Sequence, residues 1–91
     1  MEIPPDIQVY VDSATRRISI CTRTLTFVEE KLIHVVQTSL GDRSLDYMSF
    51  MNWIEANVRG YWALSSNGGN QEQFFFEKRN DAVLFKLKWG G

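Results

Sequence analysis

The sequence predicts a single two-layer α+β domain over residues 1–91, in which helices cover one face of a mainly antiparallel, four-stranded sheet. Alternating apolar residues near both ends of the chain have the period of two that is typical of strands. Apolar residues in the middle recur at helical spacing. With 44% hydrophobic and 23% charged residues, the composition suits one globular domain. The expected order of elements is β-β-α-α-β-β-α.

The N-terminal segment predicts a β-hairpin at about 6–22. Ile7, Val9 and Val11 alternate with polar residues, and the alternation resumes after a turn-rich stretch. The preceding Pro4-Pro5 pair favours extended backbone and disfavours a helix start behind it.

The segment at about 27–40 has features of a helix. Thr26 and Glu29 match a capping box, in which each side chain bonds to the backbone N–H of the other residue. Helical spacing separates Val28, Leu32, Val35 and Val36. The density of β-branched residues supports an alternative, a pair of strands that turns at 29–31.

A second helix is predicted to begin at a cap, Asp42 or Ser44, and to end at Gly60. Its apolar stripe consists of Tyr47, Phe50, Met51, Ile54 and Val58. Because the link at 41–43 is short, we expect the two helices to pack as neighbours.

The stretch 61–66 reads as a strand, and the Asn-Gly-Gly-Asn sequence at 67–70 favours a tight turn. The segment 72–78 then forms the other half of a hairpin. Phe74 and Phe76 share one face of this second strand, and we expect both in the core.

The closing segment has two interpretations. Asn80 or Asp81 can cap a short helix that starts at Ala82. That helix would turn Val83, Leu84 and Leu87 inward. Strict alternation of Val83, Phe85, Leu87 and Trp89 instead favours an edge strand protected by lysines.

The sequence FFFEKRNDAVLFKLKWGG resembles the ends of many short, uncharacterised proteins of tailed bacteriophages, which share F-x-F followed by D-A-x-x-F-x-L-x-W. The residues that match are Phe74, Phe76, Asp81, Ala82, Phe85, Leu87 and Trp89. The resemblance covers about one fifth of the chain. It implies a phage source and a strand-to-helix passage, with ferredoxin-like connectivity as an alternative fold. It therefore favours the helix.

The same segment is similar to the RNA-recognition motif, in which an aromatic strand precedes a D-A helix. The corresponding residues 69–76 lack the small residues that leave room for stacked bases. This departure argues against nucleic-acid binding.

Catalytic chemistry has little support. Cys21 and His34 are the only cysteine and histidine, and no pair of ligands has a familiar zinc spacing. A nucleophile–base pair of the two is possible in principle. We instead expect a buried structural cysteine and a histidine on a helix surface. The sequence therefore predicts no enzyme, catalytic residue, cofactor or metal.

Ten Lys and Arg residues against eleven Asp and Glu residues give a net charge of −1. This balance provides no general attraction to phosphate or to a membrane surface. A single cysteine and the lack of a long apolar run or signal peptide predict a complete cytoplasmic protein, in the host cytoplasm if it is phage-encoded.

The aromatic residues exceed what a thin core can hide, and aromatic side chains at a surface often anchor protein interfaces. Candidate partner-binding residues are Trp53, Tyr61, Trp62, Lys86 and Lys88. We expect a small non-enzymatic accessory protein that binds a protein partner or itself. The alternative is a single-stranded nucleic-acid-binding protein, in which tryptophans stack on bases.

Overall fold

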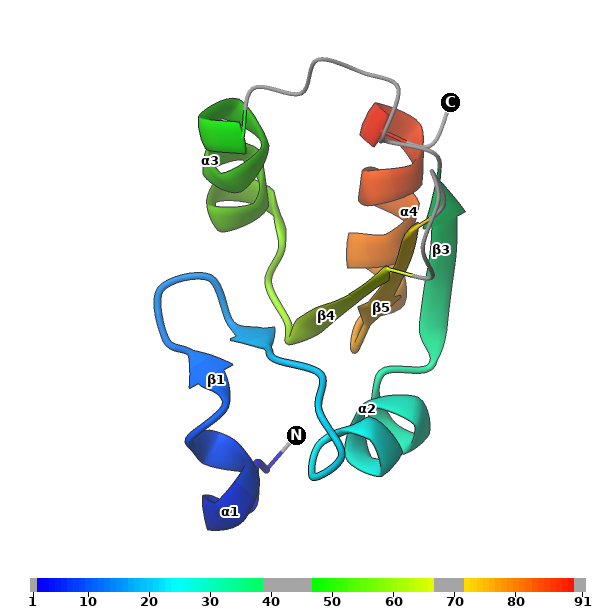
Figure 1. The fold of residues 1–91 in the computed structure, drawn as a ribbon. Coiled ribbons are helices and arrows are strands. Elements are labelled where there is room, and N and C mark those ends of the chain that lie inside the picture. Colours follow the sequence, from blue (N-terminus) through cyan, green and yellow to red (C-terminus); the bar gives the residue numbers. More distant parts are fainter. Residues whose placement is uncertain (1, 39–46, 67–71, 90–91) are drawn as a thin grey trace.

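Five strands form one mixed sheet in the computed structural model of the chain, which describes residues 2–38, 47–66 and 72–89. The strand order is β1-β2-β4-β5-β3 (Figure 1). The elements are α1 (Pro5–Gln8), β1 (Val11–Asp12), β2 (Arg17–Ile18), α2 (Leu25–Lys31), β3 (His34–Thr38), α3 (Tyr47–Asn57), β4 (Trp62–Ser66), β5 (Glu72–Phe76) and α4 (Arg79–Trp89).

The single α+β domain is confirmed, but its sheet differs from the four antiparallel strands that the sequence predicts. β2 lies parallel to β4, through the pair Arg17 and Trp62. The pairs β1–β2, β3–β5 and β4–β5 are antiparallel. The fifth strand is β3, which occupies most of the segment expected to end the first helix.

The N-terminal hairpin is confirmed only around its turn. Residues 5–8 form a helix instead of a strand, and Val9 is exposed. The prediction failed because Pro5 lies in the first turn, where its missing N–H costs nothing. The amide of Ile7 donates to the Pro4 carbonyl at 3.0 Å, and the Ile7 side chain is buried.

The segment predicted as a helix at 27–40 divides into α2 and β3. The prediction of a capping box is wrong, because α2 begins after Thr24 and Thr26 lies exposed inside the helix. The expected helix pair around 41–43 does not form, since a strand precedes that link. β3 pairs with β5 along five residue positions, so tertiary pairing decides this segment.

The C-terminal hairpin and helix are confirmed. β4 and β5 pair in antiparallel register, and the helical interpretation of the closing segment is correct, although α4 starts at Arg79. The predicted turn at 67–70 and the cap candidates Asp42 and Ser44 lie outside the described residues.

The predicted orientation of α4 is wrong. Val83, Leu84 and Leu87 are exposed, whereas Ala82 and Phe85 are buried and Trp89 is half-buried. Asp81 is also buried, and it lies inside the first turn of α4 instead of at the N-cap position that the sequence predicts. It bonds to the segment before β4 instead.

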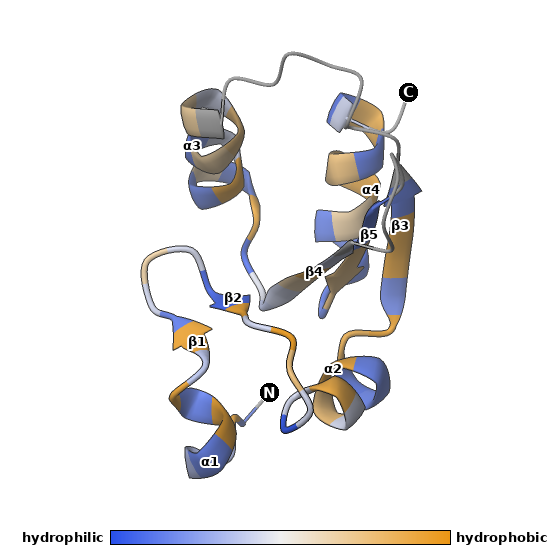
Figure 2. Cartoon of the chain, viewed as in Figure 1, coloured by the Kyte–Doolittle hydropathy of each residue, from blue (hydrophilic) through white to orange (hydrophobic). Residues whose placement is uncertain are grey.

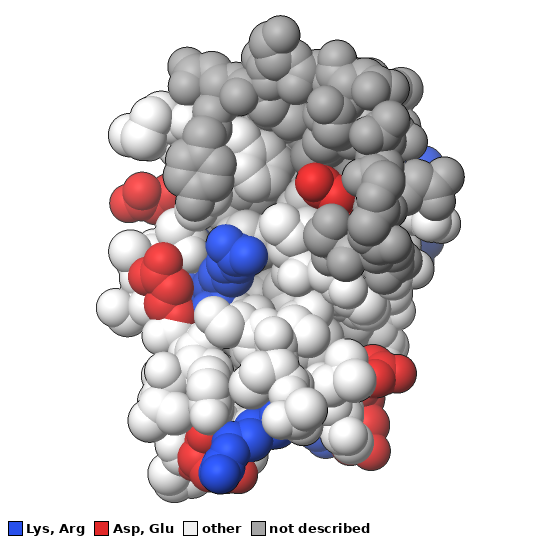
Figure 3. All heavy atoms as spheres, viewed as in Figure 1, with Lys and Arg blue, Asp and Glu red and all other residues white. Residues whose placement is uncertain are grey.

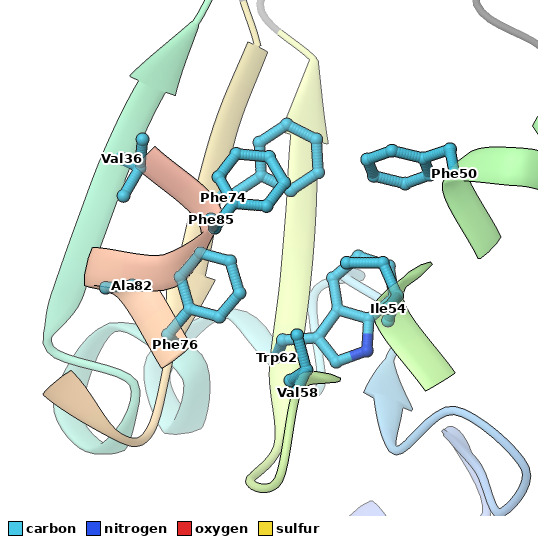
Figure 4. Close-up of a cluster of buried hydrophobic side chains, with 9 residues drawn as sticks. All are labelled: Val36, Phe50, Ile54, Val58, Trp62, Phe74, Phe76, Ala82 and Phe85. Carbon is cyan, nitrogen blue, oxygen red and sulfur yellow. The ribbon is translucent and has the colours of Figure 1, made fainter. Parts of the chain in front are cut away.

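Helices cover both faces of the sheet, not one. Phe74 and Phe76 point to the side of α3 and α4 (Figure 4). There the ring centroid of Phe85 lies 4.4 Å from that of Phe74 and 5.2 Å from that of Phe76. Phe75 points to the opposite side and packs with α1 and α2, including Ile7 and Val28. The predicted core role of Phe74 and Phe76 is confirmed.

The connectivity from β3 to α4 is that of a split β-α-β-β-α unit. β3 and β4 flank β5, and α3 joins β3 to β4. A ferredoxin-like fold would add one more strand beside the first strand of this unit. In the described residues β3 has no such neighbour and forms an edge of the sheet.

Among the described residues, no helix combines the length and the apolar character needed to span a bilayer.

Candidate binding groove between β3 and α4

A groove of ≈ 310 Å³ runs between the edge strand β3 and helix α4. We call it the β3–α4 groove, and it is lined by Ile33, His34, Val35, Val36, Arg79, Ala82, Val83 and Lys86. Figure 1 shows β3 and α4 side by side at one end of the sheet. The four residues from α4 have the spacing i, i+3, i+4 and i+7, so one stripe of the helix forms a wall.

The floor of the groove is apolar and buried. Val36 points toward the core and is 8% exposed, as is Ala82. Ala82 lines the groove with a side chain of one methyl group. The floor is therefore shaped by packing and is not a gap left by loose side chains.

The rim keeps large apolar groups in water. Ile33 is 65% exposed and Val83 47%. Val35 is 49% exposed, but it pairs with Phe75 and therefore turns its side chain to the face of the sheet opposite α4. Leu84 and Leu87 extend this apolar surface along α4, outside the groove. Figure 2 shows hydrophobic colour on both β3 and α4. Exposed apolar groups that gather beside a groove are typical of interaction sites.

Positive charge marks the two ends of the helical stripe. Arg79 and Lys86 are both exposed and lie seven residues apart, roughly 10 Å along a helix axis. His34 adds a polar ring. None of the described residues that line the groove carries a carboxylate.

The wider surface carries both signs of charge. On the face shown in Figure 3, basic and acidic groups of the described residues are interspersed. A mixed surface of this kind gives no broad attraction to polyanions.

No family model, curated protein or solved structure matches this chain.

The structure separates the predicted partner-binding residues. Lys86 lines the groove, whereas Lys88 lies on another side of α4, with its Nζ 5.6 Å from the ring centroid of Trp89. Trp53 is half-buried on α3 and meets Trp89 edge to face at 6.1 Å. Tyr61 is half-buried just before β4 and packs against the buried cluster that contains Ile7 and Val28.

Trp62 lies in the core. Its side chain is 1% exposed, and its indole N–H donates to the Thr15 carbonyl at 2.8 Å. The Arg17 guanidinium lies over the ring at 5.7 Å. In this structure the ring offers no face to a partner or a base.

Cys21 and His34 lie in different elements of the fold. Cys21 is half-buried in the turn before α2, not at the end of a strand, and His34 begins β3 instead of lying on a helix. A hydrogen bond from the Thr24 hydroxyl is the main cause that lowers the pKa of the Cys21 thiol, and burial opposes it. The Oγ1–Sγ distance is 3.7 Å, but Oγ1 lies 2.6 Å from the Ser19 carbonyl, which competes for its single proton.

Metal-binding groups do not gather in the described residues, where no three His, Cys, Asp or Glu side chains could hold one ion.

Sequence reasoning missed most of the groove. Ile33, Val35, Arg79 and Val83 were not candidates, because 33–36 was expected to be helical and Val83 was expected to point inward. The density of β-branched residues at 27–40 was the one sequence feature that indicated a strand in this segment.

Proposed function

We propose that this chain is a small non-enzymatic accessory protein that binds another polypeptide in the β3–α4 groove. One observation carries the proposal: an edge strand and a helix flank a shallow, open apolar floor that has exposed apolar groups and two cations on its rim. Grooves of this composition suit protein segments, whose apolar side chains fill the floor while polar groups meet the rim.

We also propose that the protein is encoded by a tailed bacteriophage. The resemblance of the closing segment to tailed-phage proteins supports a phage-encoded protein that acts in the host cytoplasm. Five of the seven matching residues lie on α4, which also forms one wall of the groove, so the resemblance and the site share this helix.

Single-stranded nucleic-acid binding is a weaker alternative. Stacking needs accessible aromatic faces, but Trp62 is buried and Trp89 packs against Phe50 and Trp53. The groove has two cations on its rim and lacks a continuous basic track. Anisotropy titrations with labelled oligonucleotides discriminate the two functions, since phosphate binding weakens steeply with salt.

A selection from a random peptide library on the purified protein tests the proposal. Val83→Glu and Leu84→Glu are a matched pair, because the two residues are neighbours with similar exposure, 47% and 44%, and only Val83 lines the groove. We expect selected peptides to bind the wild type and Leu84→Glu, and to lose binding to Val83→Glu. Peptides that tolerate both substitutions equally, or a selection that enriches none, would contradict a groove function.

A further inference from the structure

We propose that the β3–α4 groove takes an extended segment of a second protein, which adds as a strand to the open edge of β3 and carries acidic residues on both sides of an apolar one. This inference rests on the proposed function and names the chemistry of the partner. Four steps support it.

The first step is the edge. β3 ends the strand order β1-β2-β4-β5-β3, so in the described residues only β5 pairs with it. Every second residue of an edge strand turns its backbone N–H and C=O away from the sheet. An added strand can bond to those of these groups that lie along 33–36, which line the groove, and main-chain bonds of this kind give affinity to peptides of many sequences.

The second step is the shape. The lining includes four consecutive residues at the strand, 33–36, and one stripe of the helix. A peptide strand lying along β3 turns alternate side chains toward α4. An apolar side chain on that face then meets the floor formed by Val36 and Ala82.

The third step is charge. Arg79 and Lys86 stand at the two ends of the α4 stripe, with Ala82 and Val83 between them. Side chains two residues apart on one face of a strand are about 6.7 Å apart. Acidic residues two positions before and after the apolar residue therefore extend toward the two cations, and complementary charges of this kind select the partner.

The fourth step excludes a second copy of the chain as occupant. The segment Ile33–Thr38 carries no carboxylate. If β3 paired with β3 of another copy, the paired strand itself would bring no carboxylate to Arg79 and Lys86. Charge complementarity thus favours a foreign acidic strand.

The test uses fluorescence anisotropy with a labelled peptide of sequence Thr-Glu-Thr-Val-Thr-Glu-Thr and its counterpart with Lys in place of Glu. We expect binding of the acidic peptide only. Lys86→Glu should weaken it by about tenfold or more, because like charges repel. Lys88→Glu, which makes the same change in net charge outside the groove, should leave it within about twofold.

Backbone methylation distinguishes strand addition from other modes. In an extended strand the N–H groups of alternate residues point to opposite edges. One probe is N-methylated at both Glu residues and at Val, and the other at the two inner Thr residues, whose N–H groups point to the opposite edge. We expect one of the two probes to lose binding and the other to retain it, whereas equal behaviour of both would overturn strand addition.

The remaining outcomes separate this inference from the proposed function. If the acidic peptide does not bind, the inference is overturned. The proposed function still survives in that case if the random library yields other peptides whose binding is abolished by Val83→Glu. A dimer that Val83→Glu dissociates, measured by analytical ultracentrifugation, would also overturn the inference, since a second copy would then occupy the edge. Circular dichroism of each variant confirms that it is folded.

Discussion

The carboxylate of Asp81 accepts a hydrogen bond from the backbone N–H of Gly60, with Oδ2 2.8 Å from the nitrogen. Both oxygens also lie 3.1 Å from the amide nitrogen of Arg59. Asp81 is 2% exposed, so one buried side chain ties the first turn of α4 to the segment that enters β4. This tie fixes the start of the helix whose side forms a wall of the β3–α4 groove.

Asp81→Asn should destabilise the protein by about 1.5–3 kcal/mol, the usual range for a hydrogen bond to a charged group. The amide keeps the shape of the side chain but replaces one charged acceptor with an N–H₂ group that faces backbone donors. Urea denaturation followed by circular dichroism measures the loss. The control is Glu55→Gln, an exposed residue on α3, and equal midpoints for the two variants would disprove the role of Asp81.

Gly60 is required for space. A Cβ at this position would lie 2.8 Å from Oε1 of Glu77, and the same oxygen accepts the Tyr61 amide at 3.2 Å. Gly60→Ala should therefore displace Glu77 and cost about 1 kcal/mol through the lost bond. A double-mutant cycle with Glu77→Ala checks this account, because the added methyl should cost less once the Glu77 side chain is gone.

The Thr24 hydroxyl organises the turn before α2. It accepts the Cys21 amide at 2.9 Å and lies 2.6 Å from the Ser19 carbonyl, in a side chain with no exposed surface. Thr24→Val leaves buried polar groups unpaired and should cost about 1–3 kcal/mol. Thr24→Ser keeps the hydroxyl and should lose much less in the same denaturation experiment.

The same pair of variants tests the reactivity of Cys21. The Thr24 hydrogen bond is the main cause that lowers the pKa of this thiol, so its removal should raise the pKa. The thiolate fraction at neutral pH then falls, and alkylation by iodoacetamide should slow in Thr24→Val but not in Thr24→Ser. An unchanged pH profile of the alkylation rate would show that the hydroxyl proton belongs to Ser19 alone.

The sequence patterns that predicted structure correctly are those in which local and tertiary preferences agree. The strands at 61–66 and 72–78 flank a strong turn sequence, and Phe74 and Phe76, two residues apart, meet the same core in the structure. Only the resemblance predicts the helix at the end of the chain, since strict alternation of Val83, Phe85, Leu87 and Trp89 favours a strand.

The groove could not be predicted because it depends on a pairing between distant segments. Val35 and Val36 fit helical spacing with Val28 and Leu32. The segment that contains them forms a strand instead of a helix because it pairs with the aromatic strand β5. That pairing places 33–36 beside α4 and creates the edge. Trp62 was a candidate for partner binding, but it is buried because its strand, β4, lies between β2 and β5 in the sheet.

The orientation of α4 gives the last prediction. Phe85 has no exposed surface and packs against Phe74 and Phe76, whereas Leu87, two residues later, is 78% exposed. Truncating a buried phenylalanine typically costs about 3–5 kcal/mol, a large share of the ~5–15 kcal/mol that stabilises a domain. Phe85→Ala should therefore unfold near the start of a urea titration, while Leu87→Ala should unfold within about 0.5 kcal/mol of the wild type. If Leu87→Ala is the more destabilised variant, α4 is rotated from the orientation described, and Val83 and Lys86 no longer line the groove.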